Sequence, residues 1–141
     1  MRHRNSRSTL AAISFGFALV MAVASGERLV AHHSFAAEFD ITKPVTLTGK
    51  ITKIEWTNPH AFLFIDVTDK QTGTVTNWEI ELGSPNGLTR LGWTRTLLKS
   101  GDEVTIDGSL GRNKPTLANA RSVVMTATGK KLAAGSSEGA R

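Results

Sequence analysis

The sequence predicts an all-β domain with a short helical insert, arranged as a five-stranded OB-like barrel. Two observations lead to this fold class. Five short segments have the alternating or continuous apolar character of strands and are separated by turn residues. A serine–proline pair between the third and fourth segments opens a predicted short helix, which suits the layout of an OB-type barrel. A small open sandwich is the alternative architecture.

An export signal is expected over residues 1–31. Three arginines precede a largely apolar run at residues 10–24, and a more polar stretch follows. The run has 15 residues, fewer than the roughly 20 of a membrane-spanning helix, so no membrane span is expected after the signal is removed. The expected location is therefore periplasmic or secreted.

Two cleavage sites compete at the end of this signal. Cleavage after Ala24 satisfies the small-x-small rule, whereas cleavage after Ala31 places Leu29 at the −3 position. The second cut makes His32 the mature N-terminus. The domain is then expected at residues 32–132, with a flexible C-terminal tail, rich in glycine, alanine and serine, at residues 133–141.

Composition excludes several functional classes. The chain has no cysteine, which rules out disulfides, thiolate catalysis and cysteine-bound zinc. Its net charge of +5 lies mostly in the predicted signal, which holds four arginines and one glutamate. The remaining lysines and arginines are scattered singly, so no nucleic-acid partner is expected. A small ligand, a metal or a periplasmic protein remains as the partner.

The first strand is expected at residues 45–56. Apolar residues occupy odd positions as far as Ile51 and even positions from Ile54 onward. This change of phase predicts a β-bulge near Thr52 and Lys53. Gly49 indicates either a close approach of another backbone or a bend.

The second and third strands are expected at residues 60–68 and 74–82. The second is apolar on both faces, so Phe62 and Phe64 are assigned mainly to the core, with an aromatic binding platform as the lesser interpretation. On the third strand, Glu79 and Glu81 share one face. We interpret them as a solvated face rather than as a catalytic carboxylate pair.

The second half of the domain begins with a helix expected at residues 85–91, capped by Ser84. Trp93, just after this helix, is expected to plug the barrel. Two more strands are expected at residues 102–110 and 117–126, with a frayed chain beyond Thr128.

Three histidines form the candidate metal site. If the mature chain begins at His32, its free amine and imidazole form a chelate suited to Cu(II), to which His33 and His60 could add. Glu38, Asp40 or Glu55 could supply an oxygen ligand. The alternative interpretation is that the histidine pair is solvated and that His60 is an ordinary turn residue after Asn-Pro.

Several strings of the sequence resemble a known family. They are HHSFAAEFD from His32, EWTNPH ending at His60, LTG around Gly49, and LGSPN and LGWTR flanking the predicted helix. Together they resemble a family of small exported bacterial proteins with no assigned function, over residues 32–132. The resemblance implies a periplasmic, OB-like, single-domain protein, and it favours cleavage directly before the histidine pair. It supplies no catalytic residue.

The function expected from the sequence is that of a small exported binding module without enzymatic activity. The alternative is a periplasmic copper-binding protein that uses His32, His33 and His60. An oxidative copper enzyme with an N-terminal histidine brace is a third hypothesis, and it requires the copper site to exist first.

Overall fold

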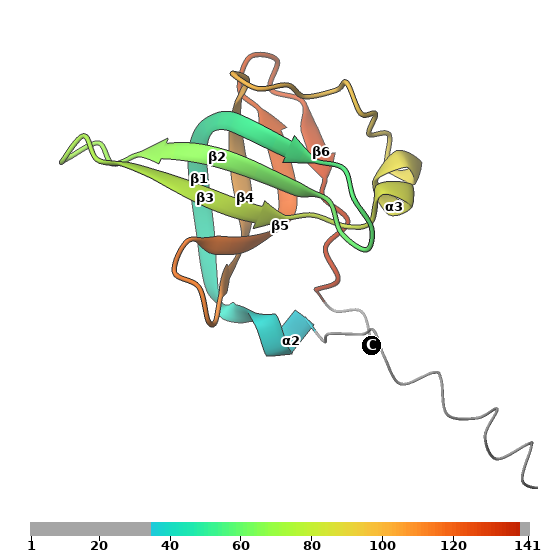
Figure 1. The fold of residues 1–141 in the computed structure, drawn as a ribbon, viewed down its shortest axis with the longest axis horizontal. Coiled ribbons are helices and arrows are strands. Elements are labelled where there is room, and N and C mark those ends of the chain that lie inside the picture. The colour runs from blue at the N-terminus through green and yellow to red at the C-terminus, as the bar shows by residue number, and fades with distance from the viewer. Residues whose placement is uncertain (1–34, 139–141) are drawn as a thin grey trace, which may run out of the picture. The chain divides into compact units, whose positions relative to one another are not determined.

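The computed structural model describes residues 35–138, which form an all-β domain with two short helices (Figure 1). This confirms the predicted class. Six strands form one sheet in the order β3-β2-β1-β4-β5-β6. The helices are α2 (Phe35–Glu38) and α3 (Pro85–Arg90), and the strands are β1 (Phe39–Glu55), β2 (Phe62–Thr68), β3 (Val75–Glu81), β4 (Glu103–Gly111), β5 (Leu117–Met125) and β6 (Lys131–Ala133).

Strand β1 is long and curved, and it serves two neighbours. Residues 39–50 pair with β4, whereas residues 50–55 pair with β2. The register with β2 shifts between Ile51 and Lys53, which confirms the predicted bulge. The prediction at Gly49 is also confirmed, because a Cβ atom there would lie 2.5 Å from the carbonyl oxygen of Asp66. The strand begins earlier than expected, since Phe39 already pairs with Gly111.

A parallel contact between β3 and β5 joins the two ends of a five-strand series. Residues 79–81 of β3 pair with Leu117–Asn119, so hydrogen bonds run around a closed circuit of β3, β2, β1, β4 and β5. One edge of strand β5 pairs with β4, and the other edge pairs with two different strands. Its first residues pair with β3, and residues 122–124 pair with β6.

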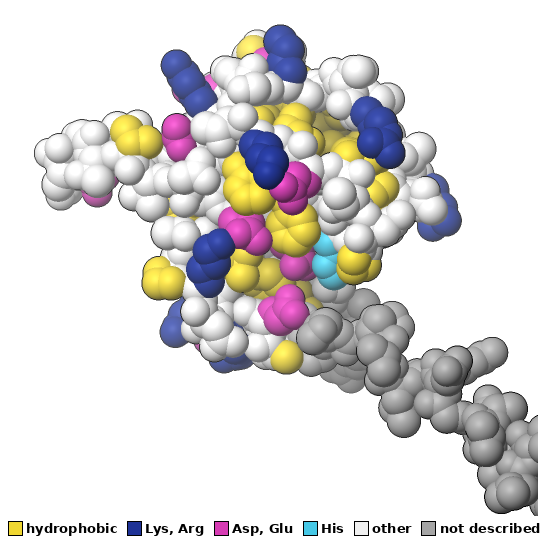
Figure 2. All heavy atoms as spheres, in the orientation of Figure 1, with side chains coloured by type: hydrophobic (Ala, Val, Ile, Leu, Met, Phe, Trp, Pro, Cys, Tyr) yellow, Lys and Arg dark blue, Asp and Glu magenta, His cyan; other side chains and the backbone are white. Residues whose placement is uncertain are grey.

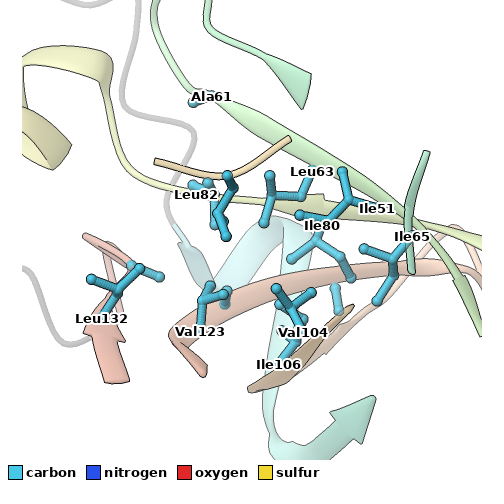
Figure 3. Close-up of a cluster of buried hydrophobic side chains, with 14 of the residues drawn as sticks. Ile51, Ala61, Leu63, Ile65, Ile80, Leu82, Val104, Ile106, Val123 and Leu132 are labelled. Carbon is cyan, nitrogen blue, oxygen red and sulfur yellow. The ribbon is translucent and has the colours of Figure 1, made fainter. Parts of the chain in front are cut away.

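The core lies inside this circuit, where apolar side chains of opposing strands point toward one another (Figure 3). The members of the core are contributed by all six strands, by α3 and by the segments that flank them. Leu63, Ile65, Ile80, Val104 and Ile106 are all fully buried. Each of them alternates with an outward-facing neighbour, as the pleat of a strand requires.

Helix α3 lies between β3 and β4 in the chain, where the sequence predicted it. The Ser84 hydroxyl accepts a hydrogen bond from the Gly87 amide at 3.2 Å, and Pro85 occupies the first turn. Trp93 follows the helix and is 2% exposed within the core. Its indole Nε1 donates to the carbonyl of Ala133 at 2.8 Å, which fastens this insert to β6.

The C-terminal part of the described chain differs from the expectation. The expectation that the chain is frayed beyond Thr128 is wrong, because Lys131–Ala133 form β6, which pairs with β5. The segment after β6, expected to be a flexible tail, is also held in place. Ala134 is fully buried, and its carbonyl accepts from the Gly83 amide at 2.8 Å. Residues 139–141 of the expected tail lie outside the described residues.

Burial of β6 has a measurable consequence for stability. Leu132 is 4% exposed, so Leu132→Ala should lower the free energy of unfolding by about 2–5 kcal/mol through lost contacts and a cavity. Urea denaturation measures this change. Lys131→Ala, at the exposed neighbouring position, is the matched control and should change stability by less than about 0.5 kcal/mol. Equal effects of the two substitutions would contradict the packing of β6.

Candidate functional site

His60 lies in the turn before β2 and contacts a buried carboxylate at the end of β3. Its Nδ1 atom is 3.2 Å from Oε1 of Glu81. The imidazole is 37% exposed and the Glu81 side chain only 8%, so the pair spans the boundary between solvent and interior. Because Nδ1 faces the carboxylate, Nε2 is the ring nitrogen that remains for another ligand.

A chain of polar side chains continues inward from Glu81. Asn119, which is 1% exposed on β5, donates its amide to Glu81 Oε1 at 3.3 Å. The amide oxygen of Asn119 in turn accepts from the Ser136 hydroxyl at 2.5 Å. Ser136 also accepts from the backbone amide of Glu138 at 3.0 Å. Ser136, in the segment after β6, therefore donates a hydrogen bond to Asn119, which in turn donates to the Glu81 carboxylate.

Burial raises the pKa of Glu81 above its ordinary value. The neighbouring His60 imidazole lowers this pKa, and the carboxylate of Glu38 raises it again, but burial has the largest effect. The expectation that Glu79 and Glu81 form one solvated face is thus wrong for Glu81. The alternation of residues along a strand identifies which side chains share a face. Whether that face is buried depends on residues from other parts of the chain that pack over it.

Arg112 fixes the place where the N-terminal part of the domain begins. Its guanidinium Nε donates to the carbonyl oxygens of Ala36 and Phe39, at 2.9 and 3.1 Å, and its Nη1 lies 3.3 Å from Asp40. The Arg112 amide donates to the carbonyl of Glu38 at 2.8 Å. These contacts hold α2 and the start of β1, and Glu38 interacts electrostatically with Glu81.

Phe62 and Phe64 lie on the outer face of β2, not in the core. Neither belongs to the buried cluster or to the partly buried side chains packed against it, which corrects their expected core assignment. Figure 2 shows this side of the molecule, where hydrophobic side chains alternate with acidic ones and the histidine lies beside them. We call this surface the β2 outer face and define it by Lys53, Glu55, Phe62, Phe64, Glu79 and Glu81.

The register arranges the β2 outer face in two rows across β1, β2 and β3. One row is Lys53, Phe64 and Glu79. The other is Glu55, Phe62 and Glu81. Each phenylalanine therefore has a charged residue of a neighbouring strand on both sides, at a strand spacing of about 4.8 Å.

Two lysines meet the carboxylates of this face. The ammonium group of Lys53 lies 5.1 Å from the centre of the Phe64 ring and also pairs with Glu55. Lys114, from the turn between β4 and β5, pairs with Glu79 at 2.5 Å. The β2 outer face thus combines aromatic rings with partly compensated negative charge.

The predicted metal ligands are only partly within the described chain. His60 is described, whereas His32 and His33 lie outside residues 35–138, as do the predicted signal and both cleavage sites. Among residues 35–138, no group of three or more histidine, aspartate and glutamate side chains could hold a metal ion. Over the same residues, no helix is long and apolar enough to cross a membrane.

Two open hollows lie away from His60. One, of about 660 Å³, is lined by residues of β1, β4, β5 and β6, including Thr46, Asp107 and Ser122. The other, of about 560 Å³, is lined by residues around Gly49 and Asp66. Most of the residues that line each hollow are polar or charged, and apolar residues complete both linings.

Sequence reasoning singled out His60 but missed its partners. The sequence pattern assigns Glu81 to solvent, and it does not indicate a role for Asn119 or Ser136. Asparagine and serine are common in turns and on surfaces, so their type alone does not indicate a buried role. One signal in the sequence does indicate the contact. In an antiparallel hairpin the start of the first strand lies beside the end of the second, and these two positions are near His60 and at Glu81.

A family model described as "Family of unknown function (DUF6152)" covers residues 19–119 of the 141. No curated protein matches the chain.

The raised pKa of Glu81 predicts a pH dependence of stability. Because folding raises this pKa, the ionised carboxylate is less favourable in the folded state than in the unfolded state. The contribution of Glu81 to the stability of the folded state is therefore fully present below about pH 4.3, the ordinary pKa of a glutamate side chain. It is lost as the pH rises through the pKa of Glu81 in the folded state. Glu81→Gln removes this titration.

The measurement is chemical denaturation of wild type and Glu81→Gln between about pH 4 and pH 8. The stability of the wild type relative to the variant should fall as the pH rises. Glu79→Gln, on the same strand, is the matched control for loss of a carboxylate. A relative stability that stays constant or increases with pH contradicts the raised pKa.

Proposed function

The chain belongs to this family of unknown function, and we propose that it is a small exported binding module, not an enzyme, built on an OB-type barrel. The closed strand circuit and the place of α3 between β3 and β4 support the barrel. Export to the periplasm is supported by the arginines and apolar run at the start of the sequence.

The observation that carries the binding role is the outward position of Phe62 and Phe64. Large apolar side chains are stabilising when they are buried, and here the core is filled without them. Both rings remain partly exposed on the β2 outer face, flanked by charged residues. In OB-type barrels the face of the second and third strands commonly binds ligands, which makes this surface the proposed contact.

Site-specific photo-crosslinking tests the binding role. A photoreactive residue in place of Phe64 should form adducts in the exporting cell. The same residue in place of Thr105, equally half-buried on the outside of β4, should form few or none. Adducts that are absent at position 64, or equally abundant at both positions, would contradict a binding role for this face.

The same proposal predicts that the two phenylalanines contribute little to folding. Replacing both with threonine, which suits a strand, should cost less than the about 2–5 kcal/mol expected for Leu63→Ala in the core. Thermal or urea unfolding gives the comparison. A double variant that is as unstable as Leu63→Ala would assign the rings a structural role.

A second candidate function, copper binding, is supported by the geometry at His60. A metal-ligating histidine commonly donates its other ring nitrogen to a carboxylate, and Glu81 provides that contact at Nδ1. Glu38, which interacts with Glu81, is six residues from His32 in the sequence. Six extended residues span at most about 20 Å, so the length of chain between Glu38 and His32 is compatible with the proposed ligand set.

Cu(II) titration of the protein processed from its own signal tests this candidate. His60→Ala should weaken Cu(II) binding by at least about 10–100-fold, since even the residues that orient a metal-ligating histidine have effects of that size. His32→Ala and His33→Ala test the other two ligands. Unchanged affinity in His60→Ala removes this residue from the site, and a processed wild type that does not bind Cu(II) refutes the copper function.

A further inference from the structure

The two phenylalanines of the β2 outer face have different surroundings. Phe64 has Lys53 on one side and Glu79 on the other. The ammonium group of Lys53 lies over its ring, 5.1 Å from the ring centre. The protein therefore already uses this face to hold a cation against an aromatic ring, a favourable contact between the charge and the ring quadrupole.

Phe62 has a carboxylate on both sides. Glu55 of β1 and Glu81 of β3 are its direct neighbours in the sheet. Among residues 35–138, no lysine or arginine lies over the Phe62 ring. This ring thus has the same outward position as Phe64 and a carboxylate on each side, of which Glu55 also pairs with Lys53. No cation from the described part of the chain lies over the ring itself.

The described contacts of the Glu81 carboxylate involve one of its two oxygens. Both of its described contacts, from His60 and Asn119, fall on Oε1. No fully buried side-chain oxygen or nitrogen among the described residues lacks a hydrogen-bond partner. The other oxygen, Oε2, is therefore not completely enclosed, although the Glu81 side chain as a whole is only 8% exposed.

We propose that Phe62, Glu55 and Glu81 form a site for the guanidinium group of an arginine side chain on a partner protein. A guanidinium is planar and stacks on an aromatic ring, and its outer nitrogens donate to carboxylates beside that ring. A lysine ammonium lacks the flat shape and the fork of donors. The phosphates of a nucleic acid are repelled by the same two carboxylates, although OB-type barrels often bind nucleic acids.

This site rests on the proposed binding role of the β2 outer face and specifies the chemistry of its partner. The probe is a short blocked peptide with one arginine, and its control is the same peptide with citrulline, which keeps the shape and removes the charge. Each is titrated into the ¹⁵N-labelled processed protein and followed by NMR. The arginine peptide should cause saturable shifts centred on Phe62 and its two neighbours.

The variants test the residues of this site. Phe62→Leu and Glu55→Gln should each weaken binding of the arginine peptide about two- to fivefold. Glu103→Gln, at an exposed carboxylate of β4 outside this face, is the matched control and should leave the affinity unchanged. Thermal unfolding checks that each variant is folded, so that a loss of binding is not a loss of structure.

Several results would overturn the arginine site. They are equal binding of the citrulline peptide, no saturable binding, and an effect of Glu103→Gln as large as that of Glu55→Gln. The binding role itself is judged separately by crosslinking at position 64. If that position crosslinks a partner while the arginine peptide does not bind, the binding module stands and the arginine site is wrong.

Discussion

The parallel contact between β3 and β5 is the constraint on which the rest of this structure depends. It consists of only three residue pairs, but it turns a series of strands into a closed circuit with one interior. Leu63 and Ile80 fill that interior, so the alternate side chains of β2 and β3 must face outward. The same contact sets Asn119 beside Glu81 and thereby buries a carboxylate next to His60.

Much of the fold was predictable because its signals are local. The bulge after Ile51 appears in the sequence as a change in the apolar period, and the cap at Ser84 as a serine–proline pair. Strand β6 was missed because three residues do not make a period, and only Leu132 among them is large and apolar. Its assignment depends on pairing with β5, which local sequence does not encode.

The candidate site was less predictable, for the same reason. A strand that is apolar on both faces suggests cover on both sides, yet the closed circuit has one inside and leaves Phe62 and Phe64 on the other. For Glu81 the error was the reverse. Its face was identified correctly, but Asn119, Ser136 and His60 approach it from distant parts of the chain. The sequence thus indicated residue types, and tertiary contacts determined their environments.

The position of the closing strands in the chain has a consequence for biosynthesis. Strand β5 and the segment through Ala134 complete the circuit and the core, and they are the last of the described strands to leave the ribosome. Until they emerge, β3 has no β5 partner and the interior is open on one side. The closed circuit and its core therefore cannot be complete before residues 117–134 have been synthesised. Export of the kind proposed needs an incompletely folded chain, and this order of synthesis is compatible with that need.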